Sequence, residues 1–171
     1  MSSNLLKPAA LAALLGLSAC GFTPLYGGPQ GVAASAQLDE VAVANIPERT
    51  GQLLRQSLET QLHTAGAPVS ELYELKVTYT VATSGIGVLQ DTATTRNRLT
   101  ATAQWSLTPI GNPGQALLSG TATAMNAENV VDQQYFALTL ESDTVNKQLA
   151  DQVAGEITAQ IAAWFRAHPN A

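Results

Sequence analysis

The sequence predicts an α+β domain in which two helices pack on one face of a four-stranded mixed or antiparallel sheet, in the order β-α-β-β-β-α. Two observations support this class. Apolar and polar residues alternate in three segments in the middle of the chain, as in strands with one buried and one hydrated face. Two other segments repeat apolar residues every four positions, as amphipathic helices do. Each of these helices needs an apolar surface to cover, and a sheet supplies it.

The first strand and the first helix are expected at the start of the domain. Residues 38–46 alternate in the manner of a strand, and Pro47 ends it. Residues 49–64 then carry one apolar face, which consists of Leu54, Leu58 and Leu62, with Leu53 beside it. Four leucines on one helix face must pack on something, and the sheet is the expected partner.

Three further strands are expected over residues 73–83, 98–108 and 117–125. The Pro- and Gly-rich residues 109–114 are typical of a turn between the last two. Residues 84–97 form a long connection, which we interpret as the tip of a protruding hairpin whose strands continue past the sheet.

The chain is expected to end in a long helix over residues 141–167. Its apolar stripe consists of Val145, Leu149, Val153, Ile157, Ile161 and Phe165. Thr139 and Ser142 are both candidate N-caps, so the start is left open. Gly155 lies inside this helix and is expected to mark a close contact with the sheet.

Composition excludes several classes of function. The net charge is −5, so there is no basic footprint for a nucleic-acid partner. One cysteine excludes an internal disulfide, and two histidines disfavour a metal site. No nucleophile–base motif or phosphate-binding glycine loop is present. We therefore expect a non-enzymatic protein without a cofactor.

Residues 1–19 have the order of a secretory signal peptide: a positive start, an apolar middle and small residues before a boundary. The apolar run from residue 8 to residue 19 is too short for a bilayer span, which needs about 20 residues. We expect this segment to be removed.

The only cysteine follows this segment directly. Leu17-Ser18-Ala19-Cys20 resembles a bacterial lipobox. The resemblance implies that the Cys20 thiol accepts a diacylglyceryl group and that, after cleavage before Cys20, its amine is acylated too. Gly21 stands where an aspartate would indicate inner-membrane retention, so the resemblance implies an outer-membrane destination.

Residues 20–37 are rich in Gly, Pro and small residues, and they are expected to form a lipidated tether to a single domain over residues 38–171. Phe22, Leu25 and Tyr26 are too apolar for a free linker, so we expect them to dock on a partner or on the domain. A merely solvated tether is the alternative.

Arg96 and Arg98 stand out in a chain with only eight lysines and arginines. Two residues apart in a strand, they would share a face. Their guanidinium groups could bind phosphate through paired hydrogen bonds. A solvated or edge-protecting pair of charges is the alternative.

Cys20 followed at once by GFTPLYG resembles the lipopolysaccharide-assembly lipoprotein family LptE, particularly its alphaproteobacterial type. The helix start at residues 49–55, the strand entry at residues 95–99 and the segment at residues 135–137 are similar as well. The family's fold agrees with the element order predicted above.

The resemblance implies an interaction protein, lipid-anchored through Cys20 in the inner leaflet of the outer membrane, on the periplasmic side. Such lipoproteins plug and help to assemble a large LptD-type β-barrel and assist insertion of lipopolysaccharide into the outer leaflet. The partners expected are that barrel and lipopolysaccharide. Arg96 and Arg98 would bind lipid A phosphates or barrel carboxylates. A low-charge, threonine-rich sheet face suits a polar barrel interior.

Two other hypotheses remain. The chain could be the lipoprotein subunit of a periplasmic ABC-type lipid transporter, with the same anchor and another partner. It could also be a lipid or envelope hydrolase, which the missing nucleophile–base pair disfavours. The GFTPLYG stretch favours the barrel plug.

Overall fold

The computed structural model describes five stretches of the chain, which are residues 28–64, 70–88, 94–112, 114–129 and 135–169. The elements are α2 (Gly28–Leu38), β1 (Val41–Val43), α3 (Arg49–Leu62), β2 (Tyr73–Val88), β3 (Thr94–Pro109), β4 (Leu118–Asn129) and α4 (Tyr135–Ala167). The four strands form one sheet in the order β1-β2-β3-β4. β1 runs parallel to β2, and the other pairs are antiparallel. The predicted mixed α+β fold is confirmed.

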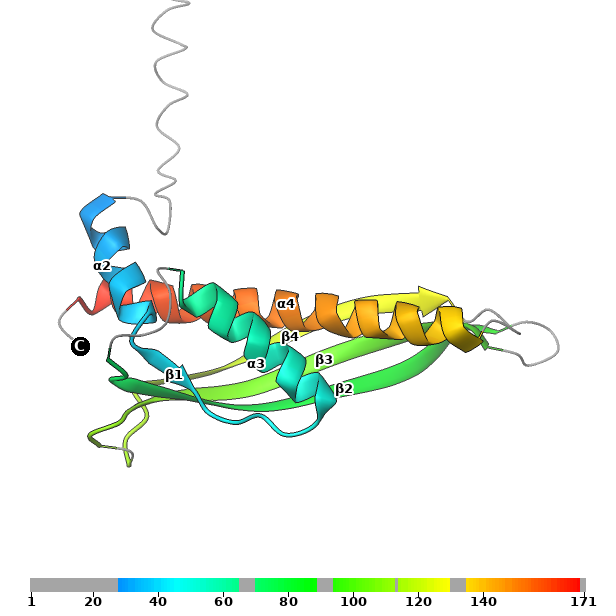
Figure 1. The fold of residues 1–171 in the computed structure, drawn as a ribbon, viewed down its shortest axis with the longest axis horizontal. Helices are drawn as coiled ribbons and strands as arrows, with labels where there is room; N and C mark the ends of the chain where they lie inside the picture. The colour runs from blue at the N-terminus through cyan, green and yellow to red at the C-terminus, as the bar shows by residue number, and fades with distance from the viewer. Residues whose placement is uncertain (1–27, 65–69, 89–93, 113, 130–134, 170–171) are drawn as a thin grey trace, which may run out of the picture.

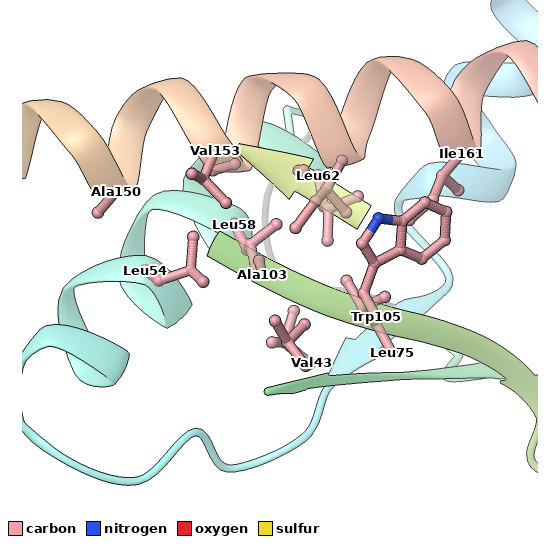
Figure 2. Close-up of a cluster of buried hydrophobic side chains, with 14 of the residues drawn as sticks. Val43, Leu54, Leu58, Leu62, Leu75, Ala103, Trp105, Ala150, Val153 and Ile161 are labelled. Carbon is pink, nitrogen blue, oxygen red and sulfur yellow. The ribbon is translucent and has the colours of Figure 1, made fainter. Parts of the chain in front are cut away.

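Helices α3 and α4 lie along one face of the sheet (Figure 1). Leu54, Leu58 and Leu62 of α3 are fully buried, as their spacing predicts. The stripe predicted on α4 is buried along its whole length. Figure 2 shows five of these side chains close to Leu75, Ala103 and Trp105 of the sheet: Leu54, Leu58 and Leu62 of α3, and Val153 and Ile161 of α4. Burying an apolar side chain of this size contributes about 1.5–3 kcal/mol relative to leaving it exposed, so this contact is the main stabilising layer of the domain.

The described part of the chain begins with a helix where the sequence analysis places a linker. α2 covers Gly28–Leu38, so residues 28–37 of the expected tether are helical and fold with the domain. Ala34 and Leu38 are buried in the core cluster, and α2 contacts α4. The Gly- and Pro-rich composition of this stretch disfavours a helix, but tertiary packing overrides that preference.

β1 is much shorter than predicted. Its last sheet bond runs from the Ala44 amide to the Leu75 carbonyl, at 2.9 Å. Ile46 then turns into the core, where it is 1% exposed. A Cβ atom on Gly51 of α3 would come within 2.7 Å of the Ile46 Cγ2 atom, so the missing side chain at Gly51 makes room for it. The chain therefore leaves the sheet because Ile46 packs beneath the start of α3.

The other strands are longer than predicted. β2 and β3 continue to Val88 and from Thr94, so the expectation that their strands continue past the main sheet is confirmed. α4 begins at Tyr135, which means that neither Thr139 nor Ser142 is its cap.

Glycine contacts also differ from the prediction. The nearest atom to a Cβ on Gly155 would be Gln61 Oε1 of α3, at 3.4 Å, so Gly155 faces a helix and the expected sheet contact is wrong. The close approach in the sheet is at Gly120, where a Cβ would lie 2.9 Å from the Trp105 ring. The indole occupies the space that a side chain at position 120 would take.

The free energy of unfolding is expected to depend on pH through one residue that packs against the core. Tyr79 of β2 is half-buried, and its hydroxyl has no hydrogen-bond partner among the described residues. Burial raises the pKa of Tyr79 from 10.0 to about 12. The folded state therefore favours the neutral phenol. The neutral Tyr79 side chain contributes fully to the free energy of unfolding below pH 10.0, its pKa in the unfolded chain. This contribution is lost as the pH rises to about 12, its pKa in the folded chain. We expect Tyr79→Phe to make the free energy of unfolding fall less steeply in this window.

Urea unfolding of the native chain and of Tyr79→Phe at several values between pH 9 and pH 12 tests this expectation. The Tyr73 pKa is also raised, first by burial and second by the Glu40 charge, but Tyr73 is present in both proteins and cancels in the difference. Parallel pH profiles for the two proteins would show that Tyr79 does not contribute.

Candidate lipid- and partner-binding face

The face of the sheet opposite α3 and α4 is covered by no described helix (Figure 1). We call it the open face. Strand alternation places a hydroxyl-rich set of side chains on it: Thr78, Thr80, Thr100, Thr102, Thr121 and Thr123. The register aligns Thr80, Thr102 and Thr123 across three neighbouring strands. The open face is therefore polar but nearly uncharged in its middle.

Arg96 and Arg98 lie at one end of the open face, near the start of β3. Both are exposed, whereas Leu99 is buried on the opposite face, so the shared face predicted from their spacing is confirmed. Arg98 is paired across the sheet with Ser84 and Ala127.

Among the described residues, the Arg96–Arg98 pair has no acidic neighbour on its face. Neither side chain forms an ion pair within the described ranges. Glu128 of β4 is close in the register, but its carboxylate accepts a hydrogen bond from Asn97 on the opposite face, at 3.4 Å. A guanidinium pair without a carboxylate partner is suited to binding an anion such as phosphate.

An apolar side chain lies next to this cationic pair. Met125 of β4 is 67% exposed. It is paired with Thr100, one step along the open face from Arg98, and Ala82 lies on the other side of Thr100. Methionine is flexible and adapts to irregular apolar surfaces. This end of the sheet therefore offers both positive charge and apolar surface, which together suit a phosphorylated amphiphile.

Two grooves lie among the described helices on the helical face. A groove of 540 Å³ between α2, α3 and α4 is lined by Leu38, Gly155 and five hydroxyl or amide side chains. A second groove, of 230 Å³, shares Thr60 and Gln61 with it. Within the described residues, no cluster of His, Cys, Asp and Glu could hold a metal ion.

His63, the one histidine inside the predicted helix region, has a structural contact. Its Nε2 atom lies 2.9 Å from the Val41 carbonyl on the outer edge of β1. The imidazole therefore ties the end of α3 to the first strand, which the sequence did not indicate.

The other predicted site residues, which are Cys20, Phe22, Leu25 and Tyr26, lie outside the described residues. In the part of the chain that the structure describes, no helix is both long and apolar enough to cross a membrane.

Two polar residues on α4, which the sequence did not indicate as functional, form hydrogen bonds with β4 at the free edge of the sheet. Glu156 accepts a hydrogen bond from the Thr123 amide at 3.1 Å. Gln148 accepts one from the Asn126 side chain at 2.7 Å. These residues belong to the polar side of α4, and sequence spacing alone could not show which strand they approach.

Comparison with known proteins identifies this fold. A lipoprotein from Caulobacter crescentus CB15 is 23% identical, with a TM-score of 0.61 over 81% of this chain and 98% of that one. A minor lipoprotein from Acinetobacter baumannii is 21% identical, with a TM-score of 0.57 over 72% and 91% of the two chains. The rare lipoprotein B from Shewanella oneidensis is 13% identical, with a TM-score of 0.55 over 73% and 93%. No curated protein sequence matches the chain. At these identities the solved structures support the fold.

The class of protein follows from a family model described as lipopolysaccharide-assembly, which matches residues 38–161. The protein is a lipopolysaccharide-assembly protein. Because the match covers well over half of the chain, it belongs to the LptE family. That family consists of non-enzymatic, outer-membrane-associated lipoproteins.

Proposed function

We propose that this protein plugs and helps to assemble a large LptD-type β-barrel of the outer membrane, and that it assists insertion of lipopolysaccharide into the outer leaflet. The protein acts from the periplasmic side, held in the inner leaflet by a diacylglyceryl group and an N-acyl chain on Cys20. The observation that carries the proposal is the open face, a sheet surface rich in hydroxyl groups that no described helix covers. Membership of the LptE family supports the same partners.

The chemistry of the open face suits a barrel interior. The lumen of an outer-membrane barrel is polar and hydrated, unlike its lipid-facing side. Threonine hydroxyls both donate and accept hydrogen bonds, so rows such as Thr80–Thr102–Thr123 can pair with many polar partners. A face with few charges avoids the desolvation cost that buried, unpaired ions would bring.

A pull-down tests the proposed function. The full chain, tagged at its C-terminus, is recovered from outer membranes dissolved in mild detergent, and the retained proteins are identified by mass spectrometry. A stoichiometric large β-barrel is expected. Recovery of ABC-transporter components would instead support a lipid-transporter subunit, and recovery of no partner would contradict both.

The Arg96–Arg98 pair predicts affinity for phosphorylated lipid. A hydrogen bond to a charged group contributes about 1.5–3 kcal/mol, so Arg96→Ala/Arg98→Ala is expected to weaken lipopolysaccharide binding by roughly 10- to 100-fold. The matched control is Arg96→Lys/Arg98→Lys, which keeps both charges but loses the paired hydrogen bonds. Its affinity for lipopolysaccharide should lie between the affinities of the native chain and of the double alanine variant.

Binding of lipopolysaccharide and of its dephosphorylated form to each variant, measured at one salt concentration, separates the outcomes. The native chain should discriminate between the two lipids, and the double alanine variant should not. Equal affinity of the native chain and the alanine variant for the phosphorylated lipid would remove the pair from the lipid site and favour a solvated pair of charges.

A further inference from the structure

Strand β2 has a long edge that no described strand pairs with. β1 covers only Tyr73–Leu75, and its last backbone bond is the one from the Ala44 amide to the Leu75 carbonyl. From Lys76 to Val88, β2 has β3 on one side and no strand on the other within the described ranges. We call the outward side of residues 77–86 the β2 edge.

The backbone groups on this edge follow from the register. The Leu75 carbonyl and the Tyr73 amide both bond toward β1, whereas the Leu72 carbonyl bonds toward the β3 side. Backbone direction alternates along a strand, so odd-numbered residues direct their amide and carbonyl groups away from β3. The register has no bulge before Gly85. Four residues therefore present backbone groups that bond to no other described residue: Val77, Tyr79, Val81 and Thr83.

No described side chain is bonded to the β2 edge in the way that one is bonded to the opposite edge of the sheet. On β4, the outward Thr123 amide is bound by the Glu156 carboxylate of α4. Residues 77–86 (VTYTVATSGI) contain no charged residue and no proline. Proteins commonly block free edges with charges, prolines or covering side chains, because an open edge can pair with another strand. Described side chains protect the β4 edge and not the β2 edge of the same sheet, and this difference indicates that another strand pairs with the β2 edge.

We propose that an extended segment of the partner barrel protein adds to the β2 edge as a fifth strand. Backbone hydrogen bonds would give the affinity, and alternating side chains would give the specificity. This inference rests on the proposed function, because it takes the segment from the barrel partner. The added partner strand would continue the open face on one side of the sheet, and on the other side it would cover the half-buried Tyr79 and Val81. The segment should therefore alternate polar and apolar residues.

Charge identifies one more feature of that segment. Ser84 is paired with Arg98, so a partner residue beside Ser84 on the open face would lie two strand spacings, about 10 Å, from the Arg98 backbone. An aspartate or glutamate there could meet the Arg98 guanidinium across Ser84. Residues 77–86 contain no carboxylate, so a second copy that pairs through these same residues would place none beside Ser84. The Arg98 charge therefore favours a different chain over self-association.

The decisive variants are Thr83→Pro and Thr83→Ala. Thr83 is exposed, and proline there removes an outward amide while leaving the bonds to β3. Thr83→Ala truncates the side chain and keeps the amide, so it is the matched control. In the pull-down, Thr83→Pro should retain at least tenfold less barrel than Thr83→Ala. Equal retention by two folded variants would overturn the inference and leave the proposed function standing.

Amide hydrogen exchange provides the second measurement, and it does not depend on a variant that folds. In the detergent-solubilised complex, exchange at Val81 and Thr83 should slow at least tenfold relative to the full chain alone. Unchanged exchange in a complex that contains the barrel would overturn the inference. Slowing that appears in the isolated chain and grows with its concentration would assign the edge to a second copy and overturn it too. Absence of a barrel from the native pull-down would overturn both proposals.

Discussion

Replacing Cys20 by serine is expected to abolish lipid attachment and to remove the protein from the outer membrane. Cys20 is the only thiol in the chain, so no other side chain could accept the diacylglyceryl group as a thioether. Each buried methylene contributes about 0.8 kcal/mol, which makes one acyl chain a marginal anchor and two or three a durable one. Loss of the whole set leaves a domain whose described helices offer no alternative membrane span.

Metabolic labelling with palmitate and fractionation of the envelope measure this effect. The native chain should carry label and separate with the outer membrane, and Cys20→Ser should carry none. Because Cys20→Ser can keep its uncleaved leader, the matched control is the same variant behind an ordinary cleavable signal peptide, and it should be soluble in the periplasm. Label in Cys20→Ser, or a control that stays with the outer membrane, would contradict anchoring through Cys20.

The sheet and the two main helices could be predicted because local patterns determine them. The stripe from Val145 to Phe165 repeats at the helical period, and every member is buried. The alternation around Leu99, Ala101 and Ala103 likewise matches a buried strand face. A period of this kind reflects which side of a helix or strand faces the core. It can therefore be recognised in the sequence without knowing which other element packs against that side.

The errors arose where tertiary contacts outweigh local preference. α2 forms in a segment whose glycines and proline resemble a linker, because Ala34 and Leu38 find a place in the core. β1 stops early because Ile46 packs under α3 beside Gly51. Neither contact can be read from spacing, since both depend on how segments far apart in the sequence meet in space.

Some features of the candidate site could also be predicted from local sequence patterns, whereas others depend on how the strands assemble. Spacing was enough to place Arg96 and Arg98 on one face. Within the described residues, their lack of a nearby carboxylate depends on the register that points Glu128 to the opposite face, and that register is not encoded locally. The β2 edge follows from strand order and from the short length of β1, so it could be found only once the sheet was assembled.

Phe165→Ala should be among the most destabilising single changes in the described core. Phe165 is fully buried near the end of α4. Its ring lies 5.1 Å from the Tyr73 ring and 5.3 Å from the Trp164 ring, measured between centroids. Truncating a buried phenylalanine to alanine costs about 3–5 kcal/mol, because apolar contacts are lost and a cavity remains. Domains of this size are stable by about 5–15 kcal/mol, so the loss is a large fraction of the total.

The contact of Phe165 with Tyr73 also indicates which part of the domain Phe165→Ala should destabilise. Tyr73 is the first of three β2 residues that pair with β1, so Phe165 ties the end of α4 to the junction of the first two strands. Thermal unfolding of Phe165→Ala should show a midpoint lower by on the order of 10 °C. Phe165→Leu fills most of the volume and should lose much less, and Leu72→Ala, at a side chain that is 48% exposed, should change the midpoint little. Equal midpoints for Phe165→Ala and Leu72→Ala would mean that this end of α4 contributes nothing to the core.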